Sequence, residues 1–165
     1  MLTPSLRSRR AFSMLELLVV LSMIGVLSLM AFGRTTSMLA GWRVARAAQA
    51  YGEELQSAFA IVGRDRKPVR IVYDAAAMEL KIMNRAQTIT YRRRRFDKNT
   101  EYKLYPGNIS PSTTVLEVYP PGLAADSLSV VFSRDGKFRR VRMLRGGLVQ
   151  ICSNPAAPNA VCVPA

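Results

Sequence analysis

The sequence lacks histidine entirely and has only two cysteines among its 165 residues. Without histidine there can be no Ser-His-Asp or Cys-His nucleophilic centre, no histidine-ligated zinc and no imidazole proton shuttle. Two cysteines are too few for a four-thiolate metal site. The sequence also contains no glycine-rich phosphate loop and no G-x-S-x-G nucleophile elbow. It therefore predicts a protein that is not an enzyme and that uses no cofactor or metal.

Acidic residues are scarce as well. The chain has 11 of them against 24 Lys and Arg, which gives a formal net charge of +13. Hydrophobic residues make up 49% and charged residues 21% of the chain, which excludes both a disordered polar chain and a polytopic membrane protein. The length suits one domain with an appendage.

One long apolar segment stands out near the N-terminus. Between Phe12 and Gly33 the only charged residue is Glu16. Twenty-two helical residues span about 33 Å, enough for a bilayer core of about 30 Å. The segment is preceded by Arg7, Arg9 and Arg10, so the positive-inside rule keeps the N-terminus cytoplasmic. We predict a single transmembrane helix over residues 12–33.

A secretory signal peptide is the alternative interpretation of this segment, because it also combines basic residues with an apolar run. The run here is longer than about 15 residues, and Glu16 lies at its start, where a signal peptide is normally uncharged. A small-x-small pattern at its far end keeps the alternative open. Glu16 would cost about 2.5 kcal/mol or more deep in lipid, so it needs a role or an interfacial position.

The segment Arg9-Arg10-Ala11-Phe12-Ser13-Met14-Leu15-Glu16-Leu17-Leu18-Val19-Val20-Leu21 resembles the processing signature of type IV prepilins and type II secretion pseudopilins. The resemblance implies a leader over residues 1–11, cut by a prepilin peptidase between Ala11 and Phe12. It further implies N-methylation of Phe12 and a Glu at the fifth mature position, which is Glu16. Ala11 departs from the glycine that is usual before the cut.

The same resemblance implies where the protein works. It would sit in the bacterial inner membrane with its head in the periplasm and then enter a pilus or pseudopilus filament. Its partners would be other pilins or pseudopilins, bound through the N-terminal helix. In a filament, Glu16 could neutralise the free amine of a neighbour's Phe12, which would fix the axial register because only one stagger pairs the charges.

Beyond Gly33 the helical pattern becomes amphipathic, and no proline occurs between Pro4 and Pro68. The apolar residues follow a 3–4 spacing typical of a helix packed on a core. They are Val44, Ala48, Tyr51, Leu55, Ala58 and Val62. Arg43, Arg46, Glu53 and Glu54 are expected on other faces. We predict one helix over 12–62, with residues 34–62 as its amphipathic half.

Residues 63–165 are expected to form a β-rich head. Alternating segments predict strands over 69–73, 78–82, 88–91, 115–118, 128–132, 138–144 and 148–151, with turns near Asp74, Asp135-Gly136 and Gly146-Gly147. Residues 99–122 form the longest irregular region. The predicted fold class is α+β and pilin-like: a long N-terminal helix packed on an antiparallel sheet.

The C-terminal part adds a weaker resemblance. Val130-Val131-Phe132-Ser133-Arg134-Asp135-Gly136, followed by Gly146-Gly147-Leu148-Val149, is similar to the final hairpins of H-type minor pseudopilins and FimT-type minor pilins. Heads of that kind combine the helix with two β-sheets. The resemblance implies a minor subunit, without separating a type IV pilus from a type II secretion pseudopilus.

Cys152 and Cys162 close an eleven-residue loop. In an extracytoplasmic compartment a disulfide is the expected state, worth about 3 kcal/mol in the chain-entropy model. It would fix a tail without strands to the last strand. A free thiol pair is the alternative.

The positive charge belongs to the exported part, because removing the leader takes away three of the 24 basic residues and leaves 21 − 11 = +10. Two clusters carry much of it. The first is Arg92, Arg93, Arg94 and Arg95; the second is Lys137, Arg139, Arg140, Arg142 and Arg145. Arg140 and Arg142 are expected on the face opposite Val141 and Met143.

A solvated sheet face or edge would explain such runs of basic residues. Contact with an anionic polymer would explain them too, and DNA phosphates are the leading example.

Two functions follow from these patterns. The first is a structural minor pilin or pseudopilin. The second is the same subunit acting as a receptor that captures DNA through its basic head, as some FimT-type minor pilins do.

Overall fold

The structure is a computed structural model that describes residues 13–153 and 162–165, leaving aside the side chains of residues 30–36. The predicted leader, the cut between Ala11 and Phe12 and the methylated Phe12 lie outside these residues. The chain divides into two compact units, Met1–Ser37 and Met38–Ala165.

Helix α1 (Met14–Asp65) begins and ends where its sequence signals lie. At its start, the Ser13 hydroxyl accepts a hydrogen bond from the Leu15 amide (3.3 Å) and the Ser13 carbonyl accepts one from Leu17 (3.2 Å). At its end, Arg66 adopts a left-handed φ of 50° and donates its amide to the Val62 carbonyl (2.9 Å). Pro68 then prevents further helix. The helix predicted over 12–62 is therefore confirmed from Met14 onward, with its end three residues later than predicted.

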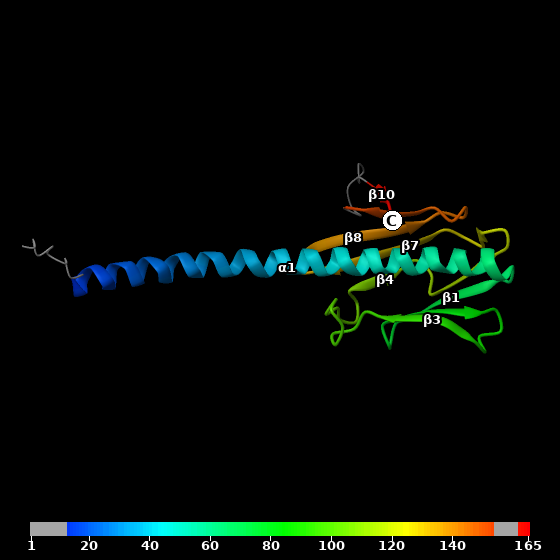
Figure 1. The fold of residues 1–165 in the computed structure, drawn as a ribbon, viewed down its shortest axis with the longest axis horizontal. Coiled ribbons are helices and arrows are strands. Elements are labelled where there is room, and N and C mark those ends of the chain that lie inside the picture. Colours follow the sequence, from blue (N-terminus) through cyan, green and yellow to red (C-terminus); the bar gives the residue numbers. More distant parts are fainter. Residues whose placement is uncertain (1–12, 154–161) are drawn as a thin grey trace, which may run out of the picture. The chain divides into compact units, whose positions relative to one another are not determined.

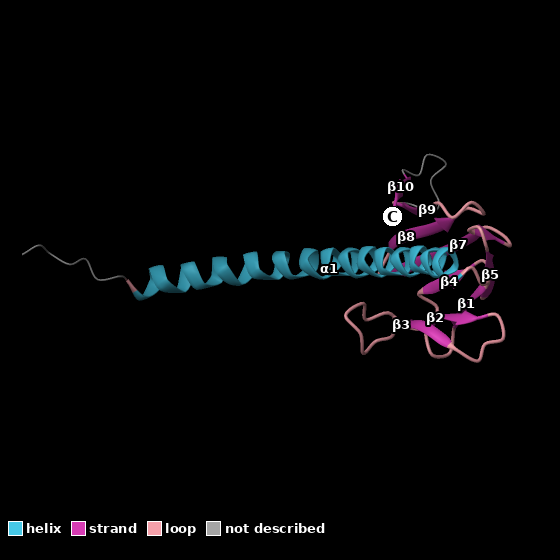
Figure 2. Ribbon diagram, turned by 45° about the vertical axis from the view of Figure 1, so that its right-hand side comes forward, coloured by secondary structure: helices cyan, strands magenta, loops and turns pink. Residues whose placement is uncertain are grey.

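Two antiparallel five-stranded sheets make up the rest of the second unit (Figures 1 and 2). Sheet A has the order β3-β2-β1-β5-β6, and sheet B the order β10-β9-β8-β7-β4. Sheet A consists of β1 (Val69–Asp74), β2 (Glu79–Asn84), β3 (Thr90–Arg95), β5 (Val115–Tyr119) and β6 (Leu123–Ala124). Sheet B consists of β4 (Ile109–Pro111), β7 (Leu128–Arg134), β8 (Lys137–Met143), β9 (Val149–Cys152) and β10 (Cys162–Pro164).

The second half of α1 packs on the inner faces of both sheets. All six residues of the predicted apolar stripe are at most 1% exposed, which confirms the amphipathic pattern. Tyr51 lies at the centre, with its ring centroid 5.5 Å from that of Phe132 in sheet B and 5.8 Å from that of Phe96 after β3. The fold is thus α+β, as predicted, with the helix joining the two sheets in one core.

Three short strands were missed from the sequence. β4 lies inside the region predicted to be irregular, and β6 has two residues. β10 pairs with β9 over Cys162–Pro164, so the expectation of a tail without strands is wrong. Stretches of two or three residues cannot display a period of two, which is why the pattern did not reveal them.

The third strand of sheet A also begins later than predicted. Thr88 lies in a turn, because the Asn84 side-chain oxygen accepts hydrogen bonds from the amides of Thr88 (2.8 Å) and Ile89 (3.0 Å). β3 therefore starts at Thr90 and includes all four consecutive arginines, Arg92–Arg95.

Gly52 allows β9 and Ala165 to approach α1 closely. A Cβ at Gly52 would lie 3.0 Å from the Cβ of Ala165 and 3.6 Å from Cγ1 of Val149. The Gln56 side-chain amide donates a hydrogen bond to the Ala165 carbonyl (2.6 Å), and the Ala165 amide donates to Val149 (3.0 Å). A residue with a side chain at position 52 would have to displace this contact.

Candidate functional site

The first helical segment is apolar on every side. Its twelve large hydrophobic side chains from Met14 to Leu29 are 45–88% exposed in the isolated chain. Hydroxyls add little polarity, because Ser22 and Ser28 donate to the backbone carbonyls of Val19 (2.8 Å) and Ile24 (2.7 Å). Such a helix needs lipid or other helices around it.

Among the described residues, no helix meets the combined requirement of length and hydropathy for crossing a membrane. The span predicted over residues 12–33 includes Phe12 and the side chains of residues 30–33, which lie outside the description, and it stays a prediction.

Glu16 occupies the first turn of α1 and is exposed. Within the described residues it forms no ion pair, and it is the only charged residue from Met14 to Leu29. A carboxylate at this end of a helix is favoured by the helix dipole. Its predicted partner, the amine of a neighbour's Phe12, belongs to residues that are not described.

The first arginine cluster is split by the alternation of strand β3. Arg92 and Arg94 point toward α1, where both bind the carboxylate of Glu54. Arg94 also donates to the Tyr102 hydroxyl (3.1 Å). Glu54 lies on a different face of the helix from the apolar stripe, as expected, but it is only 2% exposed. The arginines explain why, since a buried carboxylate requires paired cations.

The other two arginines of β3 lie on the opposite side of sheet A. Arg95 lies across the strand pair from the buried Glu79, with Nε 3.5 Å from Oε1, and Lys81 Nζ lies 3.4 Å from Oε2. The Glu79 Oε1 atom has no hydrogen bond among the described residues. Arg93 is exposed. The structure therefore does not bring the four arginines together on one surface.

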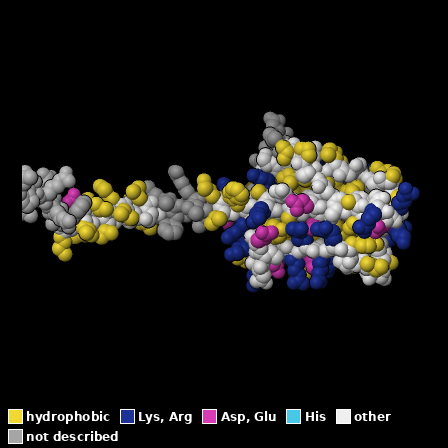
Figure 3. Space-filling model, in the orientation of Figure 1, with side chains coloured by type: hydrophobic (Ala, Val, Ile, Leu, Met, Phe, Trp, Pro, Cys, Tyr) yellow, Lys and Arg dark blue, Asp and Glu magenta, His cyan; other side chains and the backbone are white. Residues whose placement is uncertain are grey.

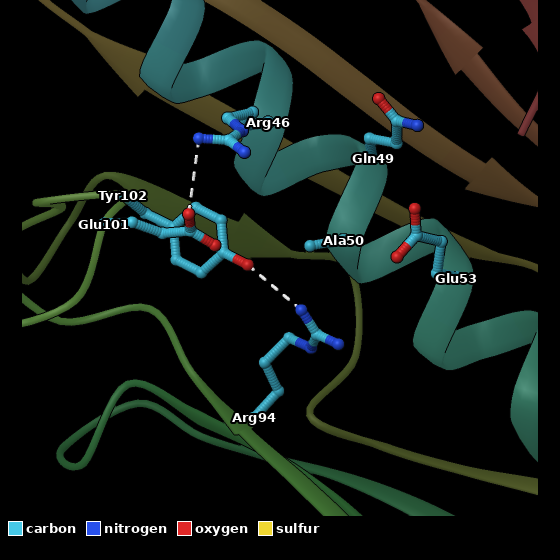
Figure 4. A pocket seen from close by; sticks show the side chains of 7 residues that line it. All are labelled: Arg46, Gln49, Ala50, Glu53, Arg94, Glu101 and Tyr102. Atoms are coloured by element: carbon cyan, nitrogen blue, oxygen red, sulfur yellow. Dashed lines mark hydrogen bonds and ion pairs between the residues drawn. The ribbon is translucent and has the colours of Figure 1, made fainter.

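A polar pocket of about 300 Å³ lies beside this cluster (Figure 4). Arg46 pairs with Glu101 at 3.3 Å on one side, and Arg94 binds Tyr102 on the other. The complete lining is Arg46, Gln49, Ala50, Glu53, Arg94, Glu101 and Tyr102. Two cations face two carboxylates, so the pocket has no excess charge with which to select an anion.

The second basic cluster lies mainly on β8. Val141 and Met143 are fully buried and face the core, whereas Arg140 and Arg142 lie on the outer face of sheet B, as predicted. Their cross-strand neighbours include Ser129 and Gln150, both beside Arg142. Arg142 is exposed, and Arg140 is half-buried with an Nε atom that has no hydrogen bond among the described residues. The cross-strand neighbours of Arg140 are Val131 and Cys152, so this basic face combines polar and apolar residues.

The remaining members of the second cluster lie around this face. Arg139 donates to the carbonyls of Phe138 and Ser153, both at 2.9 Å. Arg145 forms an exposed ion pair with Asp126 at 3.1 Å. Lys137 follows the turn at the tip of the β7–β8 hairpin and is exposed. On the face shown in Figure 3, basic side chains are spread over the second unit.

Exposed apolar residues at the start of the second unit were not singled out from the sequence. Met38 is 69%, Leu39 48% and Trp42 73% exposed. The signal was available, because these residues fall outside the stripe that packs on the sheets.

Cys152 and Cys162 form the predicted disulfide. They are directly opposite each other where β9 pairs with β10. The bond therefore joins the edge strand β10 to the rest of sheet B.

Two comparisons with known proteins agree with this picture. Residues 6–32 match the prokaryotic N-terminal methylation motif. The fold is similar to that of the type IV minor pilin FimU of Pseudomonas aeruginosa (strain PAO1), in two crystal forms. One matches with 18% identity, a TM-score of 0.53, and coverage of 70% of this chain and 98% of that chain. The other matches with 16% identity, a TM-score of 0.54, and coverage of 71% and 93%.

Curated protein sequences give no match to the chain. At 16–18% identity the FimU structures establish the fold, and the motif at residues 6–32 independently identifies the N-terminus. The chain thus carries the prokaryotic N-terminal methylation motif over residues 6–32, and 70–71% of it matches the fold of the type IV minor pilin FimU.

Proposed function

We propose that the protein is a minor pilin or pseudopilin, a structural subunit without enzymatic activity that enters a filament through its N-terminal helix. The observation that carries this proposal is the exposure of apolar side chains all around α1 from Met14 to Leu29. A helix of this kind is stable in lipid before assembly and among neighbouring helices after it. The head supplies a folded unit with its own core.

The proposal includes processing between Ala11 and Phe12 by a prepilin peptidase, followed by N-methylation of Phe12. The match of residues 6–32 to the methylation motif supports it, as does the start of α1 at Met14, only two residues after the new N-terminus. Mass spectrometry of the membrane form would show a chain that begins at Phe12 and is one methyl group heavier. A chain of unchanged length would contradict processing.

Before assembly the subunit would be anchored in the inner membrane by one span over residues 12–33, with the head in the periplasm. Arg7, Arg9 and Arg10 on the cytoplasmic side support this orientation. The Cys152–Cys162 disulfide supports an oxidising compartment for the head.

Glu16 is the proposed register residue of assembly. It is the only charge on the apolar part of the described helix, and pairing with the Phe12 amine of a neighbour would neutralise both groups. We expect Glu16→Ala to be processed normally but to enter filaments poorly. Ser13→Ala is the matched control, because it alters the same end of α1 without removing a charge. Normal incorporation of the Glu16 variant would overturn this role.

A second function, DNA capture, is favoured by one specific observation. Arg140 and Arg142 lie side by side on the outer face of sheet B, where Ser129 and Gln150 are the cross-strand neighbours of Arg142, and neither arginine has an ion-pair partner among the described residues. Such a surface would bind phosphates without reading the base sequence. The proposed DNA contacts are therefore on β8 rather than on Arg92 and Arg94, which are engaged with Glu54.

A further inference from the structure

Three apolar side chains project from α1 at the beginning of the second unit. Met38, Leu39 and Trp42 lie within about 100° of each other around the helix, on the side opposite the stripe that packs on the sheets. Nothing in the described residues covers them, since they are 48–73% exposed. Single exposed apolar residues are ordinary, but three on one helix face that include a tryptophan form a contact surface.

Basic residues flank these side chains. The β7–β8 hairpin reaches α1 at Gly41, where the Cγ atom of Lys137 lies 3.8 Å from the position of a Cβ on the glycine. Arg43 is the next helical residue after Trp42 and is half-buried. Figure 3 shows hydrophobic side chains beside Lys and Arg at this end of the second unit. We name this group the Trp42 surface: Met38, Leu39, Trp42, Arg43 and Lys137.

We propose that the Trp42 surface contacts the anionic phospholipid headgroups of the membrane that holds the N-terminal segment; this inference rests on the membrane anchoring proposed above. Tryptophan with adjacent Lys and Arg is the combination that membrane proteins place at the lipid–water interface, where the indole sits at headgroup level. Basic residues near the bilayer surface add attraction to anionic lipid.

The sequence places this surface close to the proposed span. Trp42 follows Gly33, the last residue of that span, by only nine positions. The headgroup layer extends about 5–7 Å beyond the hydrocarbon core.

A second copy of the chain is a poorer occupant of this surface. Eight of the 11 acidic residues are in ion pairs within the described residues, which leaves Glu16, Glu53 and Asp97 outside such pairs. Another copy therefore offers few carboxylates to Arg43 and Lys137. An anionic lipid layer offers a phosphate at every headgroup.

Trp42 is the only tryptophan of the chain, so its fluorescence tests the contact directly. The full chain would be reconstituted into phosphatidylcholine vesicles with or without phosphatidylglycerol. With phosphatidylglycerol we expect at least a twofold lower acrylamide quenching constant, and quenching by lipids brominated near the headgroup. High salt would reverse both effects because it screens the basic residues.

The variant Arg43→Glu/Lys137→Glu should restore acrylamide access in vesicles that contain phosphatidylglycerol. Arg66→Glu/Lys67→Glu is the matched control: it makes the same charge change beyond the other end of α1 and should leave quenching unchanged. Circular dichroism of each variant checks that the head remains folded.

Four outcomes would overturn the inference. Equal quenching with and without phosphatidylglycerol would exclude anionic lipid as the occupant. Protection that depends on the protein-to-lipid ratio alone would assign the surface to another copy of the chain. The third is failure of the chain to resist alkaline extraction from vesicles, which would overturn the membrane anchoring as well. A chain that resists extraction while its tryptophan stays accessible would overturn only the lipid contact.

Discussion

Arg92 holds Glu54 through two parallel hydrogen bonds, with Nε 2.8 Å from Oε2 and Nη2 3.0 Å from Oε1. Arg94 adds a third, from its Nε to Oε1 at 2.8 Å. This carboxylate joins the edge strand β3 to the second half of α1, across 38–40 residues of sequence. The arginine run therefore stabilises the head from within, in addition to adding surface charge.

Replacing Glu54 with Gln should lower the free energy of unfolding by about 2 kcal/mol, because two arginines lose the anion that neutralises them. The loss is smaller than for a fully buried pair, since the arginine side chains are 49% and 31% exposed. Urea unfolding measures the effect. Glu53→Gln, at the neighbouring position in the polar pocket, should change stability by less than about 0.5 kcal/mol. Equal effects of the two substitutions would contradict the structural role of Glu54.

The same carboxylate should make stability depend on pH. Burial alone would raise the pKa of Glu54, but the hydrogen bonds from Arg92 and Arg94 outweigh it and hold the pKa below its ordinary value. A lowered pKa in the folded state contributes stability that is present above about pH 4.5 and is lost as the pH falls through the folded value.

We therefore expect wild type to lose stability below about pH 4.5, and Glu54→Gln to lose less over the same range. Asp74 and Asp126 also have lowered pKa values, chiefly through backbone amide donors, and their contributions are common to both proteins. Urea unfolding at pH 7 and pH 3.5 gives the difference. Parallel pH profiles for the two proteins would show that Glu54 does not titrate as proposed.

DNA binding should distinguish the two arginine clusters. Arg140→Gln/Arg142→Gln should weaken binding of the full chain to duplex DNA and reduce the slope of log affinity against log salt by about 2. Arg92→Gln/Arg94→Gln makes the same change in charge and should lower stability while leaving the slope nearly unchanged. Fluorescence anisotropy across a salt series provides the measurement. If the Arg92/Arg94 variant showed the larger reduction in the slope of log affinity against log salt, the DNA surface would have to be assigned to β3.

Removing the disulfide with Cys152→Ser/Cys162→Ser should cost about 3 kcal/mol in the chain-entropy model. The loss should appear as a lower midpoint of thermal unfolding under oxidising conditions. A reducing agent should lower the wild-type midpoint to that of the variant and leave the variant unchanged. A wild-type midpoint insensitive to reduction would show that the β9–β10 pair is held by its other contacts.

The predictability of this fold depended on how regular each segment is. Two features could be located because their local signals are strong. They are the apolar stripe from Val44 to Val62, which recurs every three or four residues, and the hairpin that turns at Asp135-Gly136. The burial of Glu54 could not, because it depends on arginines that only the pairing of β3 with β2 brings opposite α1. The arginine run itself has no alternation of residue type, so the sequence showed its charge but not which side chains face inward.

The candidate site was predictable in part for the same reason. The processing signature is contiguous and could be recognised in a single segment, whereas the Trp42 surface combines one turn of helix with the tip of a distant hairpin. Contacts between segments separated by about a hundred residues have no signature in a single sequence.

The four edge strands of the head share features that limit its association with other heads. β3 carries four arginines, β6 is two residues long, and β4 and β10 contain Pro111 and Pro164. Charge, shortness and proline each discourage a sheet from adding strands of another molecule. In the proposed assembly, crowded heads would thereby be protected from amyloid-like stacking, and ordered polymerisation would be left to the helix.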